Sequence, residues 1–143
     1  MKYAERGFLC GVALVVLVVG TGCAGPRLAM MDARSEPAQL SAGDELFLGV
    51  RVIDPQGVVA AVTATVREES AVRFPLNDSG EDGDKVAGDG AWSLAFEVPY
   101  DAPAREYHWD FEAFDANGDP VKGTTEEGGK EPLTAEASVE VVY

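Results

Sequence analysis

Apolar residues recur at every second position through most of residues 46–143 of this 143-residue chain. The alternation marks residues 46–52, 58–66, 72–76, 92–98, 107–113 and 139–143. Successive side chains of a β-strand point to opposite faces of a sheet, so each segment predicts a strand with one buried face. Turn residues such as Asp54-Pro55-Gln56-Gly57 and Asn117-Gly118 separate the segments, and no window holds a sustained helical period. The sequence therefore predicts an all-β fold, an antiparallel β-sandwich of about seven strands over residues 42–143. Pro75 places the segment 72–76 at a sheet edge, because proline cannot donate to a ladder.

The N-terminus has the features of a secretory signal. Lys2 and Arg6 make the start weakly basic, and residues 8–19 are apolar and uncharged. A run of about a dozen apolar residues is too short to span a bilayer, but it suits a signal peptide. Small residues then lead into Cys23. This stretch resembles the lipobox of bacterial lipoproteins, in which the cysteine is acylated and becomes the first mature residue, although the family prefers an aliphatic residue at the place of Gly20.

The resemblance implies a signal peptide at 1–22, a lipidated Cys23, and attachment to a membrane through acyl chains such as palmitate. Cys23 has no disulfide partner after cleavage, because Cys10 would be removed with the signal. The other interpretations are an ordinary secretory signal with an incidental cysteine, and an uncleaved anchor. Ala24 is not the aspartate linked with inner-membrane retention, so the resemblance favours a lipid-anchored protein of the cell envelope, in the outer membrane.

Charge and composition restrict the partners and the domain boundary. The formal net charge of −14 excludes nucleic acid as a partner, since binding phosphates requires a basic face. The same charge argues against electrostatic docking on anionic lipid, so the lipid anchor is the predicted membrane contact. Residues 23–41 contain Gly25-Pro26, Glu36-Pro37 and scattered charges without a sustained period. They predict a lipidated N-terminus and a flexible tether before the sandwich.

Residues 106–118 resemble strand F and the following turn of a fibronectin type III or bacterial Ig-like domain. In those folds a tyrosine near the start of the strand forms the tyrosine corner, and Tyr107 occupies that place. Trp109 stands where antibody domains have a cysteine. The segment 77–93 is similar to a D-D-G-x-x-G-D-x-x-A-G-D-G-x-Y-S signature of Ig-like modules in secreted and surface-anchored bacterial proteins, with Asn77, an inserted Ser79 and Trp92 as departures. The resemblance implies an Ig-like β-sandwich outside the cytoplasm, and no particular activity.

The acidic segment 77–90 is the candidate metal site. Asp78, Asp82, Asp84 and Asp89 partly reproduce the oxygen spacing of an EF-hand loop, with Gly83 at its sharp turn. Gly80 stands where a further ligand would be expected. Clustered carboxylates repel one another unless a cation or water screens them, so Ca²⁺ is the candidate ligand. The alternative is a solvated acidic turn in which Asp and Gly serve the backbone angles.

The remaining residues predict no catalytic centre. His108 is the single histidine and falls on the solvated face of its strand, and the domain has no thiol for a zinc or copper site. Trp92 and Trp109 alternate in phase with the core. We expect a non-catalytic structural or binding module, with an unknown protein or polysaccharide partner. The alternative is a carbohydrate-binding or accessory subunit of an envelope enzyme, for which Phe47, Tyr100 or Phe114 would form an exposed aromatic stripe.

Overall fold

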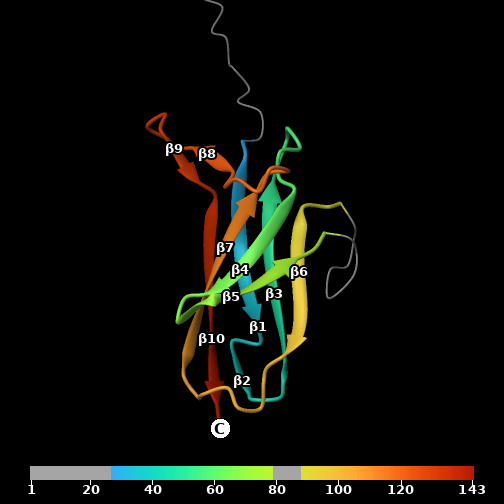
Figure 1. Cartoon of the computed structure of the whole chain (residues 1–143), viewed down its shortest axis with the longest axis vertical. Helices are drawn as coiled ribbons and strands as arrows, with labels where there is room; N and C mark the ends of the chain where they lie inside the picture. Colours follow the sequence, from blue (N-terminus) through green and yellow to red (C-terminus); the bar gives the residue numbers. More distant parts are fainter. Residues whose placement is uncertain (1–26, 79–87) are drawn as a thin grey trace, which may run out of the picture.

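The computed structural model describes residues 27–78 and 88–143. In this part of the chain all regular structure is β (Figure 1). The strands are β1 (Ala29–Glu36), β2 (Gln39–Ser41), β3 (Glu45–Ile53), β4 (Ala61–Val66), β5 (Glu69–Leu76), β6 (Ala91–Glu97), β7 (Glu106–Phe114), β8 (Lys122–Thr124), β9 (Lys130–Pro132) and β10 (Thr134–Val142). The predicted all-β fold is confirmed. Within the same residues no helix is long and apolar enough to cross a bilayer.

Two sheets carry the fold. One has the order β1-β3-β6, the other has the order β2-β10-β7-β4-β5, and β8 and β9 form a separate hairpin. Neighbouring strands are antiparallel except β2, which runs parallel to β10. Buried side chains from both sheets form one core, so the architecture is a β-sandwich. The predicted antiparallel pairing is therefore confirmed for every strand pair except β2–β10.

The alternating pattern places the predicted side chains in the core. In β3, Leu46, Leu48 and Val52 are buried. In β7, Trp109 and Phe111 are buried, and Phe111 is fully enclosed. A side chain of this size contributes about 1.5–3 kcal/mol when it leaves water, so these two central strands hold the sheets together. The predicted strand phase is confirmed for both.

The predicted tether is wrong for residues 29–41. β1 pairs with β3 and β2 pairs with β10, and the cis Glu36–Pro37 peptide lies between them. A bulge between Met31 and Arg34, where Asp32 has a φ of 54°, shifts the phase of β1 partway along its length. No single period-two pattern therefore runs through this strand, and β2 is too short to show one. The sandwich begins at β1 rather than at residue 42.

The chain changes sheets directly after β5. β5 is the edge strand of its sheet and contains Pro75, as predicted. Asn77 then pairs with Ser93 of β6, the edge strand of the other sheet. The backbone N–H of each residue donates to the carbonyl oxygen of the other, at 3.0 and 2.9 Å. This crossing places the start of the acidic segment beside β6.

The connection from β7 to β10 also differs from the sequence prediction. Residues 122–132 form the β8–β9 hairpin, closed by the Thr125–Gly129 turn, although their sequence shows no alternation of apolar residues. β10 begins at Thr134 and is longer than the predicted segment 139–143. In Figure 1 the hairpin lies at the same end of the sandwich as the start of β1.

Candidate functional site

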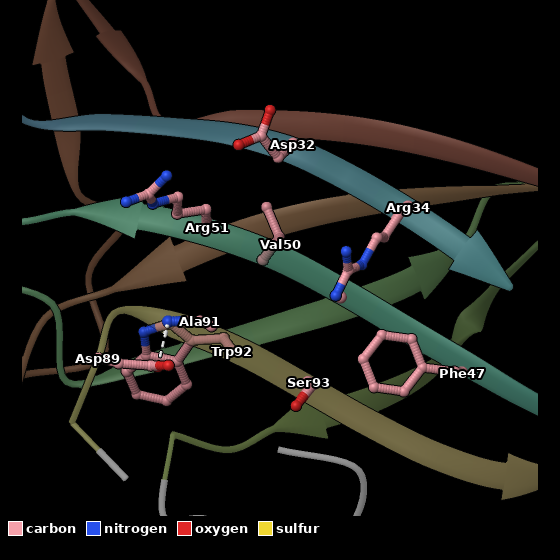
Figure 2. A pocket seen from close by; sticks show the side chains of 10 residues that line it. Asp32, Arg34, Phe47, Val50, Arg51, Asp89, Ala91, Trp92 and Ser93 are labelled. Carbon is pink, nitrogen blue, oxygen red and sulfur yellow. Dashed lines mark hydrogen bonds between the residues drawn. The ribbon is translucent and has the colours of Figure 1, made fainter. Parts of the chain in front are cut away.

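A hollow of about 470 Å³ lies on the outer face of the β1-β3-β6 sheet (Figure 2). Residues of all three strands and of the turn before β6 line it. They are Asp32, Arg34, Phe47, Gly49, Val50, Arg51, Asp89, Ala91, Trp92 and Ser93.

Strand register creates this hollow. Gly49 lies between Arg34 of β1 and Ser93 of β6, and Arg51 lies opposite Ala91. Small side chains thus occupy the middle of the sheet face, and long ones stand around them. A Cβ atom on Gly49 would lie 2.9 Å from Cε1 of Phe47 and 3.3 Å from Nε of Arg34. The absence of a side chain at this position lets those two residues fold over the strand.

Charged groups of both signs surround the hollow. The Arg34 guanidinium carbon lies 5.4 Å from the centroid of the Phe47 ring, a cation–π distance, and its Nε lies 3.8 Å from Oε1 of Glu36. Arg51 is exposed and forms no ion pair with any residue in the described ranges. Asp89 accepts a hydrogen bond from the Ala91 N–H at 2.9 Å, which holds its carboxylate beside the start of β6.

Ser93 is the buried polar residue of the hollow. It is 3% exposed although it stands on the outer face of β6, in register with Gly49. Its backbone N–H and carbonyl groups are both bonded to Asn77. Its hydroxyl has no hydrogen-bond partner among the described residues. A buried hydroxyl in that state is unfavourable and uncommon, so the site contains an unused hydrogen-bonding group.

The acidic segment is described only at its two ends. Asp78 accepts a hydrogen bond from the Gly90 N–H at 3.1 Å, and its carbonyl accepts one from Gly88 at 2.8 Å. Asp78 and Asp89 line a smaller hollow of about 330 Å³ that also includes Asp54. Asp82 and Asp84 lie outside the described residues. Within the described residues, no three acidic, histidine or cysteine side chains form a metal-binding group. Calcium binding by these four aspartates therefore stays a prediction, as does lipidation of Cys23, which also lies outside the described ranges.

His108 is half-exposed on the outer face of β7, as predicted, but it is bound to a partner that the sequence did not indicate. Its Nδ1 lies 2.6 Å from Oε1 of Glu68, and its backbone N–H donates to both oxygens of that carboxylate at 3.2 and 3.0 Å. Burial raises the pKa of Glu68, but the hydrogen bonds from His108 outweigh it and hold that pKa at about 2. Nε2 of His108 faces Glu106 at 3.7 Å. These contacts fasten the β4–β5 turn to β7.

A second charged group supports the same turn. The Arg67 guanidinium donates to both oxygens of Asp110, at 3.2 and 2.6 Å, and also to Glu136. Hydrogen bonds to these two carboxylates raise the pKa of Arg67 above its ordinary value. The group thus connects β7 and β10 to the end of β4, which indicates a structural role.

The predicted aromatic stripe is absent from the described part of the chain. Trp109 is buried against Phe74 and Phe96, and Trp92 is half-buried against the core. Tyr100 is exposed, but it lies in the β6–β7 connection, with its ring over Gly43 ahead of β3. Phe114 is half-buried at the end of β7, in the other sheet. These aromatic residues do not share one face.

Comparison with known proteins gives no relative, because no protein-family model and no curated protein matches the chain.

Proposed function

We propose that this protein is a non-catalytic lipoprotein of the cell envelope, anchored in the outer membrane through Cys23, whose Ig-like domain is a binding module. The hollow on the β1-β3-β6 face is the observation that carries the binding role. It combines Arg51, which has no ion pair among the described residues, with the unpartnered hydroxyl of Ser93. On a purely structural sheet face a buried hydroxyl such as that of Ser93 would have a hydrogen-bond partner.

Topology supports an Ig-like identity for the sandwich. The first strand belongs to one sheet, and after the cis Glu36–Pro37 peptide the chain joins the other sheet, parallel to the final strand. Tyr107, at the start of β7, donates its hydroxyl hydrogen to the carbonyl oxygen of Pro103, four residues upstream. That contact is the one that a tyrosine corner makes.

The position of β1 limits how far the domain can stand from a membrane. If Cys23 is acylated, residues 24–28 alone connect it to the first strand. Five residues span at most about 18 Å. The anchored sandwich would therefore sit close to the lipid surface, with the start of β1 and the β8–β9 hairpin at its membrane-proximal end (Figure 1).

The anchor is tested by comparing the full-length protein with Cys23→Ser in a diderm bacterial host. We expect the parent protein to partition into detergent and to begin at an acylated cysteine, as measured by intact mass. We expect Cys23→Ser to lose the acyl mass and to leave the membrane fraction or to remain unprocessed. Cys10→Ser is the matched control and should behave like the parent. An unmodified Cys23 in the mature protein would contradict the proposed anchoring.

A further inference from the structure

We propose that the hollow bounded by Arg34, Arg51 and Asp89 binds a saccharide through its hydroxyl groups. This inference rests on the proposed binding role and names the ligand class for that site. It differs from the platform of exposed aromatic residues expected from the sequence, because polar groups around a floor of small residues make the site.

The rim supplies both halves of a hydrogen-bonding pattern that suits vicinal hydroxyls. A guanidinium can only donate hydrogen bonds and a carboxylate can only accept them, whereas a hydroxyl does both. Figure 2 shows Arg51 and Asp89 toward one end of the hollow, and Asp32 and Arg34, both from β1, along its other side. A donor and an acceptor are thus available on each side. Neighbouring hydroxyls on a sugar ring can engage such a pair together.

Ser93 adds an independent observation. Its side chain is almost fully buried, lines the hollow, and has no hydrogen-bond partner in the described residues. Folding removed this hydroxyl from water without replacing the lost hydrogen bond. A ligand hydroxyl that reaches Ser93 would supply the missing partner.

The floor and the volume fit the same class. Ala91 presents a small apolar surface, and the ring of Phe47 stands at the rim, so the C–H groups of a sugar would meet carbon atoms. A volume of about 470 Å³ lies within the range of small-molecule sites, about 300–1,000 Å³. One or two sugar units are therefore the expected occupant.

The charges around the hollow favour a neutral saccharide over an anionic or zwitterionic ligand. The two arginines and two aspartates of the rim balance, while the whole chain carries −14, so an anionic ligand would be repelled by the rest of the protein. To bind a zwitterion such as a dipeptide, the site would need its carboxylates at one end of the hollow and its guanidinium groups at the other end. Here guanidinium and carboxylate groups are mixed along the rim, which favours a neutral ligand with many hydroxyls.

The experiment titrates the full-length protein with defined disaccharides in a detergent that has no sugar headgroup. The probes are diacetylchitobiose, cellobiose, maltose and lactose, with dialanine as the zwitterionic probe. Binding is read from tryptophan fluorescence, since Trp92 lines the hollow, and from calorimetry. We expect saturable binding of at least one disaccharide with a dissociation constant on the order of 1 mM, and no binding of dialanine.

Three variants locate the binding. Ser93→Ala should weaken it about five- to tenfold while the melting temperature stays the same or rises, because no protein hydrogen bond is lost. Arg51→Ala should weaken it by a similar factor. Arg73→Ala, an exposed arginine on β5 of the other sheet, should bind like the parent.

Several outcomes would overturn the saccharide site. These are no binding of any disaccharide at about 10 mM, binding of dialanine alone, or equal affinities in all three variants. Because these results do not depend on the acyl group, they are distinguishable from a failure of the anchoring experiment on Cys23.

Discussion

The Tyr107 hydroxyl donates a hydrogen bond to the carbonyl oxygen of Pro103 at a distance of 2.9 Å. This contact ties the start of β7 to the loop that precedes it, and the Arg105 guanidinium lies 5.1 Å from the centroid of the same tyrosine ring. Both contacts hold the end of the loop against the first residues of the central strand. It belongs to the connection between the two sheets, so its order affects both of them.

Tyr107→Phe should lower the free energy of unfolding by about 0.5–1.5 kcal/mol, the usual net value of one hydrogen bond. The ring and its packing are retained, so the change isolates the hydroxyl group. Urea denaturation followed by tryptophan fluorescence measures the effect. Tyr143→Phe is the control, because the C-terminal side chain is fully exposed. Equal midpoints for the two variants would show that the corner contributes nothing to stability.

Trp109 should be the most sensitive aromatic position of the core. Its ring packs edge-on against Phe74 and Phe96, which stack on each other with centroids 4.7 Å apart. Trp109→Ala leaves a cavity between the sheets and should cost about 3–5 kcal/mol. Trp109→Phe should cost clearly less, since it fills part of that cavity and removes a buried indole N–H without a hydrogen-bond partner among the described residues. Thermal and urea unfolding of both variants would test this order, and a reversed order would contradict it.

The strands that could be predicted are those with an unbroken alternation and one buried face. β3, β4 and β7 have this pattern, and their phase placed Leu46 and Trp109 in the core. β1 was missed because its bulge at Asp32 interrupts the phase, and β2 because three residues cannot show a period. β8 and β9 were missed because both are short and largely exposed.

The candidate site could not be predicted from the alternation of apolar residues, because that pattern does not say which strands lie side by side. The sequence showed Gly49 and Ser93 on their strands, but only the register of β3 with β6 places these small residues opposite each other. The contact between Glu68 and His108 likewise joins residues 40 positions apart. The hydrogen bond from Tyr107 to Pro103 was the exception, because the two residues are close in sequence.

Glu68 should make stability depend on pH in the acidic range. The hydrogen bonds from His108 hold its pKa at about 2 in the folded protein, against an ordinary value of 4.5. A carboxyl group whose pKa is lower in the folded protein than in the unfolded chain stabilises the fold at pH values above the pKa of the unfolded chain. This contribution is lost as the pH falls toward the pKa of the folded protein. We expect a loss on the order of 1–2 kcal/mol between about pH 5 and pH 2, smaller than the full shift implies because His108 is partly exposed.

Glu68→Gln measures this contribution. The variant keeps the shape of the side chain but cannot ionise, so its stability should fall less than that of the parent over the same interval. Urea midpoints at several pH values give the difference, and Glu97→Gln at the exposed end of β6 controls for general charge effects. Parallel curves for the parent and Glu68→Gln would rule out the contact with His108 as a source of acid sensitivity.

The acidic segment should stabilise the fold when Ca²⁺ is added, if its four aspartates share an ion. Extracellular calcium modules have dissociation constants of roughly 0.1–1 mM. At about ten times that concentration, an ion that binds only the native state adds about 1.4 kcal/mol. For a sandwich of this size the melting midpoint should rise by about 5–10 °C. Mg²⁺ should have a smaller effect, because it requires a tight octahedron and dehydrates reluctantly.

Three salts at matched ionic strength separate this prediction from a solvated acidic turn. If screening alone acts on the carboxylates, calcium, magnesium and sodium chlorides give the same small shift, because the Debye length depends only on ionic strength. If an ion is bound, calcium raises the melting midpoint more than the other two salts do, and Asp84→Ala abolishes that rise. Asp84→Ala also slightly stabilises the metal-free protein, because it removes one charge from a repulsive cluster. Asp119→Ala, in the turn after β7, should retain the full response. Identical melting curves in the three salts would leave the aspartates with a role in the turn alone.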